Sequence, residues 1–217
     1  MRVDADSRKL ARLWIDAIVL SAAVQTAGST LVIIFSRMLS VAEADSRALT
    51  AIFLVLAGVI TAVAHGIYGF LTGQVLERKL PAFPLRSWIA VNALLGLLYG
   101  PLIGLGVMAP TDSDPNPWTS ASLVTQYLVI GAIVNAMEGS VQALILRKVA
   151  YGTGTWIAYS ALAGVCWLLV IPDIGIFREL MSTATAFLQI MAMGLILLPA
   201  LLRLRPRTPH TIPMLFE

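Results

Sequence analysis

Three ionisable side chains interrupt long apolar stretches of this sequence: Glu138, His65 and Asp16. An ionisable group at the depth of a lipid bilayer costs at least about 2.5 kcal/mol on insertion scales, so its presence there marks a candidate functional residue. We therefore treat these three residues as the candidates for binding or proton chemistry.

Glu138 has the most polar surroundings of the three. Asn135, Gly139 and Gln142 lie within four positions of it, so they share one side of a helix with the carboxyl group. This stripe predicts a site that binds a cation or carries a proton. The alternative is a protonated glutamic acid that is hydrogen-bonded to a neighbouring helix. In both cases the stripe is expected to face the interior of a helix bundle.

His65 and Asp16 each have two interpretations. Neutral imidazole is a common axial ligand, so His65 predicts either a haem or chlorophyll-type pigment or a packing and hydrogen-bonding role. Asp16 lies one helical turn after Arg12, so it is expected to reach the membrane interface or to line a polar path with Glu138 and Asn135.

Other chemistries lack their residues in this sequence. The chain has one cysteine, Cys166, and two histidines, and it contains no phosphate-binding loop, nucleophile elbow or paired carboxylates. We therefore expect no catalytic residues, no metal site and no enzymatic activity. The lysines and arginines fall in short clusters and not along one basic face, so no nucleic-acid partner is expected.

The composition around these candidates is that of a membrane protein. Of 217 residues, 58% are hydrophobic and 12% are charged, so polar residues are too few to cover a water-soluble globule. About 20 consecutive apolar residues cross a bilayer as a helix. One all-α domain over residues 1–217 is predicted, with six transmembrane helices at 13–35, 49–75, 88–107, 120–146, 156–171 and 181–202. The first is expected to be an uncleaved membrane helix.

The distribution of basic residues predicts the orientation of these spans. Three of the 15 lysines and arginines, Arg37, Arg47 and Arg178, fall on one side of the six alternating spans, and the others fall on the opposite side. The positive-inside rule therefore places both the N- and C-termini in the cytoplasm.

Two cytoplasmic elbows between the spans have similar sequences. "GQVLERKLPAFPLRSWIAVNAL" at 73–94 and "VQALILRKVAYGTGTWIAYSAL" at 141–162 each contain a glutamine, a basic pair and Trp-Ile-Ala. Because two membrane crossings separate the copies, they predict a parallel repeat of helical hairpins, about 49–107 and 120–171, flanked by helices 13–35 and 181–202. A fainter echo around Trp14 suggests three similar hairpins.

The aromatic and basic residues of these elbows are predicted to be interfacial anchors. Tryptophan favours the headgroup region, and lysine and arginine reach towards lipid phosphates. The predicted anchors are Trp14, Trp88, Trp156, Arg78, Lys79, Arg147 and Lys148.

The second elbow resembles a pattern of small multi-pass bacterial membrane proteins. The pattern is Gln-x-x-x-Leu-Arg followed by a short loop and Trp, formed here by Gln142, Leu146, Arg147 and Trp156. In the first elbow the basic pair is shifted by one position and prolines occupy the loop. The resemblance covers about a quarter of the chain, and it implies a bacterial cytoplasmic (inner) membrane protein with no particular activity.

Small residues mark the positions where helices pack closely in lipid. Two stripes stand out, Gly96, Gly100 and Gly104 in the third span, and Gly131 and Gly139 around Asn135 in the fourth. These stripes predict packing within the six-helix bundle or against another subunit.

The first functional hypothesis is a non-catalytic integral membrane protein that packs with other membrane protein subunits into a larger inner-membrane complex. It depends on the small-residue stripes and on the sparse intramembrane chemistry. The alternative is a small transporter or substrate-binding membrane component that uses the intramembrane carboxyl group of Glu138.

Overall fold

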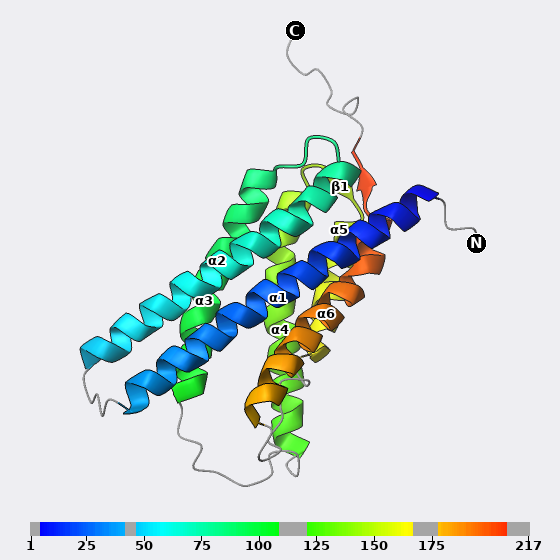
Figure 1. Ribbon diagram of the computed structural model, residues 1–217. Helices are drawn as coiled ribbons and strands as arrows, with labels where there is room; N and C mark the ends of the chain where they lie inside the picture. Colours follow the sequence, from blue (N-terminus) through cyan, green and yellow to red (C-terminus); the bar gives the residue numbers. More distant parts are fainter. Residues whose placement is uncertain (1–4, 42–46, 109–120, 167–177, 208–217) are drawn as a thin grey trace.

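The computed structural model describes residues 5–41, 47–108, 121–166 and 178–207, which are almost entirely helical (Figure 1). Two short strands, β1 (Ala150–Tyr151) and β2 (Arg205–Pro206), form one antiparallel pair. The prediction of an all-α chain is therefore confirmed. The helices are α1 (Ala5–Val41), α2 (Arg47–Lys79), α3 (Leu85–Met108), α4 (Ala121–Leu146), α5 (Thr153–Ala163) and α6 (Arg178–Arg203).

Among the described residues, three helices are long and apolar enough to cross a membrane by length and composition. They are residues 5–35 of α1, 48–79 of α2 and 186–203 of α6, and a shorter apolar helix covers 131–146 of α4. Each predicted span overlaps one helix, although α1 begins eight residues before and ends six residues after the predicted bounds. The end of the predicted fifth span, 167–171, lies outside the described residues.

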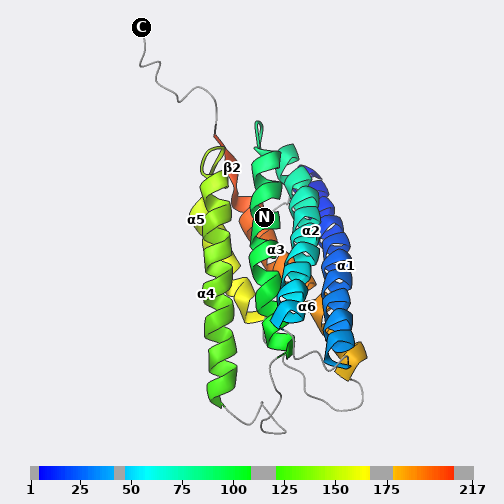
Figure 2. The same cartoon turned by 90° about the vertical axis from the view of Figure 1, so that its left-hand side faces the viewer.

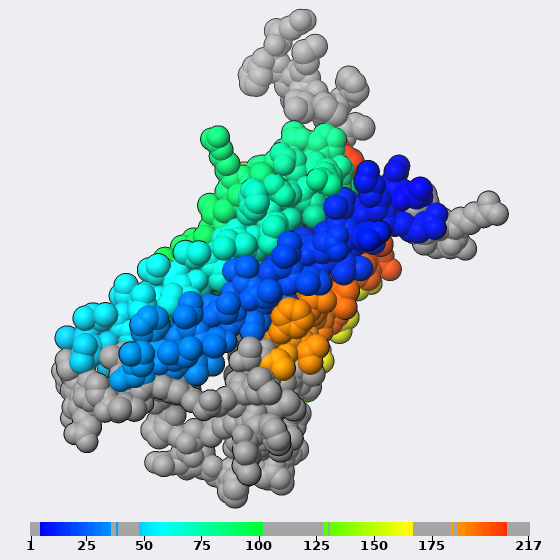
Figure 3. Space-filling model, in the orientation of Figure 1, coloured from blue at the N-terminus to red at the C-terminus, as the bar shows by residue number. Residues whose placement is uncertain are grey.

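The helices run alternately in opposite directions, which brings the two elbows to one end of the molecule. The α2–α3 and α4–α5 elbows, the start of α1 and the end of α6 all lie at this end, which we call the elbow end (Figure 1, Figure 2). The helix α1 lies across one face between α2 and α6 (Figure 3). The first and last helices are therefore neighbours, and they close the bundle.

Polar residues of α4 face inwards, and several of its large apolar residues face outwards. Asn135 and Gln142 are buried, and Glu138 lies on the same side of the helix. Such an arrangement is the reverse of a water-soluble helix, and it fits an outer surface in contact with lipid. The exposed apolar side chains of α4 are Val129, Ile133, Met137, Val141 and Leu144, and those of α2 include Ile52, Val55, Val59 and Val63.

Glycines allow α2 and α3 to approach each other closely. A Cβ atom at Gly96 would meet the backbone of Thr61, and one at Gly100 would meet the backbone of Ala57. The Thr61 hydroxyl lies in the same contact, 2.6 Å from the Gly96 carbonyl oxygen. These two glycines of the predicted stripe therefore pack within the chain. The surroundings of Gly104 lie outside the described residues.

The fourth-span stripe also packs within the chain. Gly139 of α4 lies against Ser160 of α5, and the backbone of Gly131 lies against Gly164. The stripe therefore forms the contact between α4 and the segment that begins with α5.

Gly100→Ala should destabilise the bundle, because the added methyl group overlaps the backbone of α2. Overpacking of this kind costs about 1 to 3 kcal/mol. The matched control is Gly154→Ala, where a Cβ atom meets nothing within 4 Å. Thermal unfolding of the two variants in one detergent tests the contact, and equal midpoints would contradict the close approach of α2 and α3.

Candidate functional site

Three tryptophans form the core of the elbow end. Trp14, Trp88 and Trp156 are each 0% exposed. The ring of Trp156 lies 6.1 Å from that of Trp14 and 5.9 Å from that of Trp88, both edge to face, which is a favourable aromatic geometry. The prediction that these side chains anchor the protein among lipid headgroups is therefore wrong. They lie on the inner sides of their helices, where neighbouring helices cover them.

The basic residues that were predicted to be interfacial anchors lie at the elbow end. Arg78, Arg147 and Lys148 are exposed there, and Lys79 Nζ donates a hydrogen bond to the Leu202 carbonyl at 2.9 Å. Their contact with lipid phosphates stays a prediction.

Each buried indole N–H binds the helix that runs towards the elbow end. These bonds join α1 to α6, α3 to α2, and α5 to α4 across the tryptophan core. Trp14 donates to the Gly194 carbonyl at 2.8 Å, Trp88 to Thr72 Oγ1 at 3.2 Å and Trp156 to Gln142 Oε1 at 2.9 Å.

A glycine contact recurs beside each of these hydrogen bonds. In each pair, a glycine of the first helix lies against the residue four positions after the tryptophan of the second helix. The helix pairs α2–α3, α4–α5 and α6–α1 therefore share one packing geometry. The contacts are Gly69 with Asn92, Gly139 with Ser160, and Gly194 with Ile18.

Gln74 and Gln142 each lie fourteen residues before the tryptophan of their elbow, but the structure gives the two glutamines different environments. Gln74 is exposed, whereas Gln142 is 2% exposed. The residue of α2 that accepts the indole hydrogen bond is Thr72, which is 0% exposed. The segment from Thr72 to Trp88 is two residues longer than the segment from Gln142 to Trp156. Position 72 of α2 therefore takes the place that position 142 has in α4.

Gln142 links three helices through its amide group. Its Nε2 donates to Asn92 Oδ1 at 3.0 Å and to Glu138 Oε1 at 3.1 Å, while its Oε1 accepts the hydrogen bond from Trp156. Both N–H groups and the oxygen are therefore used. A fully satisfied buried network of this kind fixes the side chains that belong to it, including the carboxyl group of Glu138.

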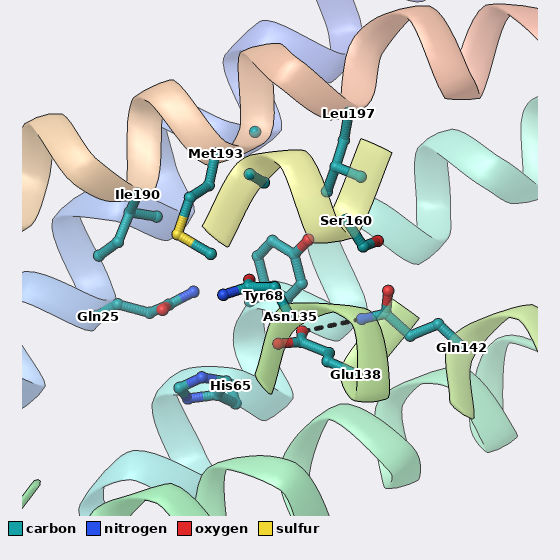
Figure 4. Close-up of a pocket in the computed structure, with 12 residues that line it drawn as sticks. Gln25, His65, Tyr68, Asn135, Glu138, Gln142, Ser160, Ile190, Met193 and Leu197 are labelled. Carbon is teal, nitrogen blue, oxygen red and sulfur yellow. Dashed lines mark hydrogen bonds between the residues drawn. The ribbon is translucent and has the colours of Figure 1, made fainter. Parts of the chain in front are cut away.

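A cavity of about 60 Å³ lies beside this network, lined by residues of α1, α2, α4, α5 and α6 (Figure 4). This volume holds roughly four water-sized groups, and it is far below the several hundred cubic ångströms of a drug-sized site. Its lining is polar on one side and apolar on the other. The polar lining is Gln25, His65, Tyr68, Asn135, Glu138, Gln142 and Ser160, and the apolar lining includes Ile190, Met193 and Leu197.

The structure brings four of the five predicted polar residues to this cavity, namely His65, Asn135, Glu138 and Gln142. Asp16 is not among them. It is exposed on the outer side of α1, because the neighbouring residues at 14, 17 and 18 form the buried side of that helix. The prediction that Asp16 lines a polar path with Glu138 is therefore wrong.

Sequence reasoning missed Tyr68 and Tyr99 as members of the site. Tyr68 lines the cavity, and Tyr99 forms a side-chain hydrogen bond with Glu138. A tyrosine in an apolar helix is usually a packing residue, so composition alone gives no reason to select either. Tyr68 precedes Gly69 as Glu138 precedes Gly139, so an alignment of these two glycines was the signal that could have found it.

His65 is fixed by its own helix. Its Nδ1 lies 3.0 Å from the Thr61 carbonyl oxygen, which can only accept, so Nδ1 carries the proton and Nε2 is left as an acceptor. The His65 ring lies 5.8 Å from that of Tyr99. A cavity of about 60 Å³ has no room for a tetrapyrrole, so the surroundings of His65 do not fit a haem or chlorophyll-type pigment.

In the described part of the chain, no group of three or more His, Cys, Asp or Glu side chains is placed to hold a metal ion. Comparisons with protein-family models, with curated proteins and with solved structures found no match for this chain. The function is therefore inferred from the geometry of the cavity.

Gln142→Leu should destabilise the elbow end, because the Trp156 indole N–H and the Asn92 amide oxygen would lose their partner. Each buried polar group left unsatisfied costs about 1 to 3 kcal/mol. Gln74→Leu is the matched control, since Gln74 is exposed. Thermal unfolding followed by tryptophan fluorescence should show a lower midpoint for Gln142→Leu alone. Equal midpoints would contradict the role of Gln142 in joining α3, α4 and α5.

Proposed function

We propose that this protein is a non-catalytic, multi-pass integral membrane protein that binds a small cation or a proton at Glu138. In this proposal it acts as a small transporter or solute-binding component of the bacterial inner membrane. The observation that carries the proposal is the cavity, because it places a carboxyl group among polar side chains from several helices.

The charge distribution supports six spans with both termini in the cytoplasm. Basic side chains of the described residues gather at the elbow end, whereas Arg37, Arg47 and Arg178 belong to the opposite ends of their helices. This separation follows the positive-inside rule. The basic residues of the elbow end are Arg8, Lys9, Arg12, Arg78, Lys79, Arg86, Arg147, Lys148, Arg203, Arg205 and Arg207.

We also infer that the chain is built from three related helix pairs, α2–α3, α4–α5 and α6–α1. The recurring indole hydrogen bond and the recurring glycine contact support this repeat. In the third pair the two helices come from opposite ends of the chain. The proposed unit is therefore an elbow with its two helices, and the first and last helices complete the third unit.

Glu138 needs a proton or a cation to balance its charge. Its carboxyl group accepts a hydrogen bond from Gln142 and interacts with Tyr99, both of which are neutral. No lysine or arginine side chain is among the residues that line the cavity. An uncompensated carboxylate away from water is strongly unfavourable, so the site favours a proton or a bound cation.

The alternative role as a subunit of a larger complex has less support from the structure. That hypothesis depended on the small-residue stripes, and Gly96, Gly100 and Gly139 pack within the chain. The outer sides of α2 and α4 carry large apolar residues, which lipid can cover without a protein partner.

Glu138→Gln should remove cation transport while preserving the fold, since the amide retains the size of the carboxyl group and its capacity to accept a hydrogen bond from Gln142. Proteoliposomes that contain a pH- or sodium-sensitive dye should show proton or sodium flux above that of protein-free liposomes. We expect at least a tenfold reduction for Glu138→Gln.

Asp16→Asn is the matched control for this experiment, because it also removes one carboxylate from an apolar stretch but lies outside the cavity. Its flux should equal that of the wild type. If both variants transport as fast as the wild type, or if the wild type transports neither protons nor any small cation, the proposed function is contradicted.

A further inference from the structure

We propose that the cavity binds a short-chain alkylammonium ion, such as methylammonium, with its nitrogen at Glu138. This inference rests on the proposed function, and it specifies the class of cation. Three properties of the cavity carry it: the acceptors on its polar side, the carbon lining on its opposite side, and its size.

The polar side offers hydrogen-bond acceptors for an ammonium group, which has up to three N–H donors. Glu138 supplies a carboxylate, and Asn135 supplies its amide oxygen because its Nδ2 already donates to the Gly131 carbonyl at 2.9 Å. Figure 4 shows Tyr68 between these residues and the helix α6. The Tyr68 hydroxyl adds an acceptor, and its ring adds an aromatic face that attracts cations.

The apolar side comes mainly from α6, with Ala163 of α5 as a small addition. Ile190, Met193 and Leu197 extend towards the cavity from this helix (Figure 4). A hard inorganic cation is bound by oxygen atoms around its whole surface, and here one side of that surface would face carbon and sulfur. An alkylammonium ion matches both sides, because its nitrogen needs acceptors and its alkyl group needs apolar contacts.

The two-sided character follows from the shared packing geometry of the three helix pairs. Counted from Gly69, Gly139 and Gly194, the same three positions of α2, α4 and α6 line the cavity, except Thr72 of α2, which hydrogen-bonds to Trp88 instead. On α2 and α4 these positions are polar, and on α6 they are apolar. The three sets are His65, Tyr68 and Thr72; Asn135, Glu138 and Gln142; and Ile190, Met193 and Leu197.

The volume limits the length of the alkyl group. A cavity of about 60 Å³ accommodates roughly four water-sized groups, which corresponds to a nitrogen and one to three carbons. Met193 is unbranched and polarizable, so it can adjust to differences of one methylene group. Tetramethylammonium has no N–H donor for the carboxylate, so it should bind poorly.

Binding of radiolabelled methylammonium chloride to the purified full-length protein in detergent tests this inference. We expect saturable binding that unlabelled ethylammonium displaces and that a hundredfold excess of sodium chloride or tetramethylammonium chloride does not. Glu138→Gln should weaken binding at least tenfold, whereas Asp16→Asn should leave it unchanged. Met193→Gln should weaken binding at least fivefold, because it makes the apolar side polar. Met193→Leu keeps this side apolar, so it should bind methylammonium as the wild type does.

The outcomes separate this inference from the proposed function. Glu138-dependent sodium or proton flux without methylammonium binding would overturn the inference and leave the proposed function intact. Displacement of methylammonium by sodium at equal concentration would overturn it as well, even if the Met193 variants fail to fold. Methylammonium binding that is unchanged in Glu138→Gln would contradict both.

Discussion

The structure depends on three buried indole N–H groups, each of which hydrogen-bonds to the neighbouring helix. They join α1 to α6, α3 to α2, and α5 to α4. In lipid the hydrophobic effect does not hold helices together, so hydrogen bonds and close packing must do so. At Trp14, Trp88 and Trp156 both occur together, because a glycine contact lies one turn from each bond. The contact fixes the distance between the two helices, and the bond fixes their register.

The cavity is a consequence of this register. Since three helices present the same positions to the cavity, Thr72 excepted, the side chains at those positions decide what the cavity contains. Large apolar residues on all three would fill it. The carboxyl, amide and imidazole groups on α2 and α4 instead hydrogen-bond to their own or neighbouring helices, and a small polar space remains beside α6.

The helices and most polar residues of the site could be predicted from the sequence, because apolar runs and the polar groups that interrupt them are local signals. Glu138, Asn135 and Gln142 needed no tertiary information. The environment of the tryptophans could not be predicted without tertiary information, because a tryptophan beside basic residues suits a headgroup contact and a buried contact equally well. The different environments of Gln74 and Gln142 likewise depend on the first elbow being two residues longer. When the two sequences are aligned on Trp-Ile-Ala, no gap appears, so this difference in length is not visible.

Closure of the bundle between its first and last helices is the most direct test of this account. Ile18→Cys with Gly194→Cys, in a chain where Cys166→Ser removes the native thiol, pairs two positions that face each other across α1 and α6, because a Cβ atom at Gly194 would meet the Ile18 side chain. Mild oxidation in membranes should form an intramolecular disulfide, seen as a mobility shift that a reductant reverses. Ile18→Cys with Leu188→Cys should not cross-link, because Leu188 is exposed on the outer side of α6, and this control leaves Gly194 in place. Absence of the first cross-link, or equal cross-linking of both pairs, would contradict the closure of the bundle by contact between α1 and α6.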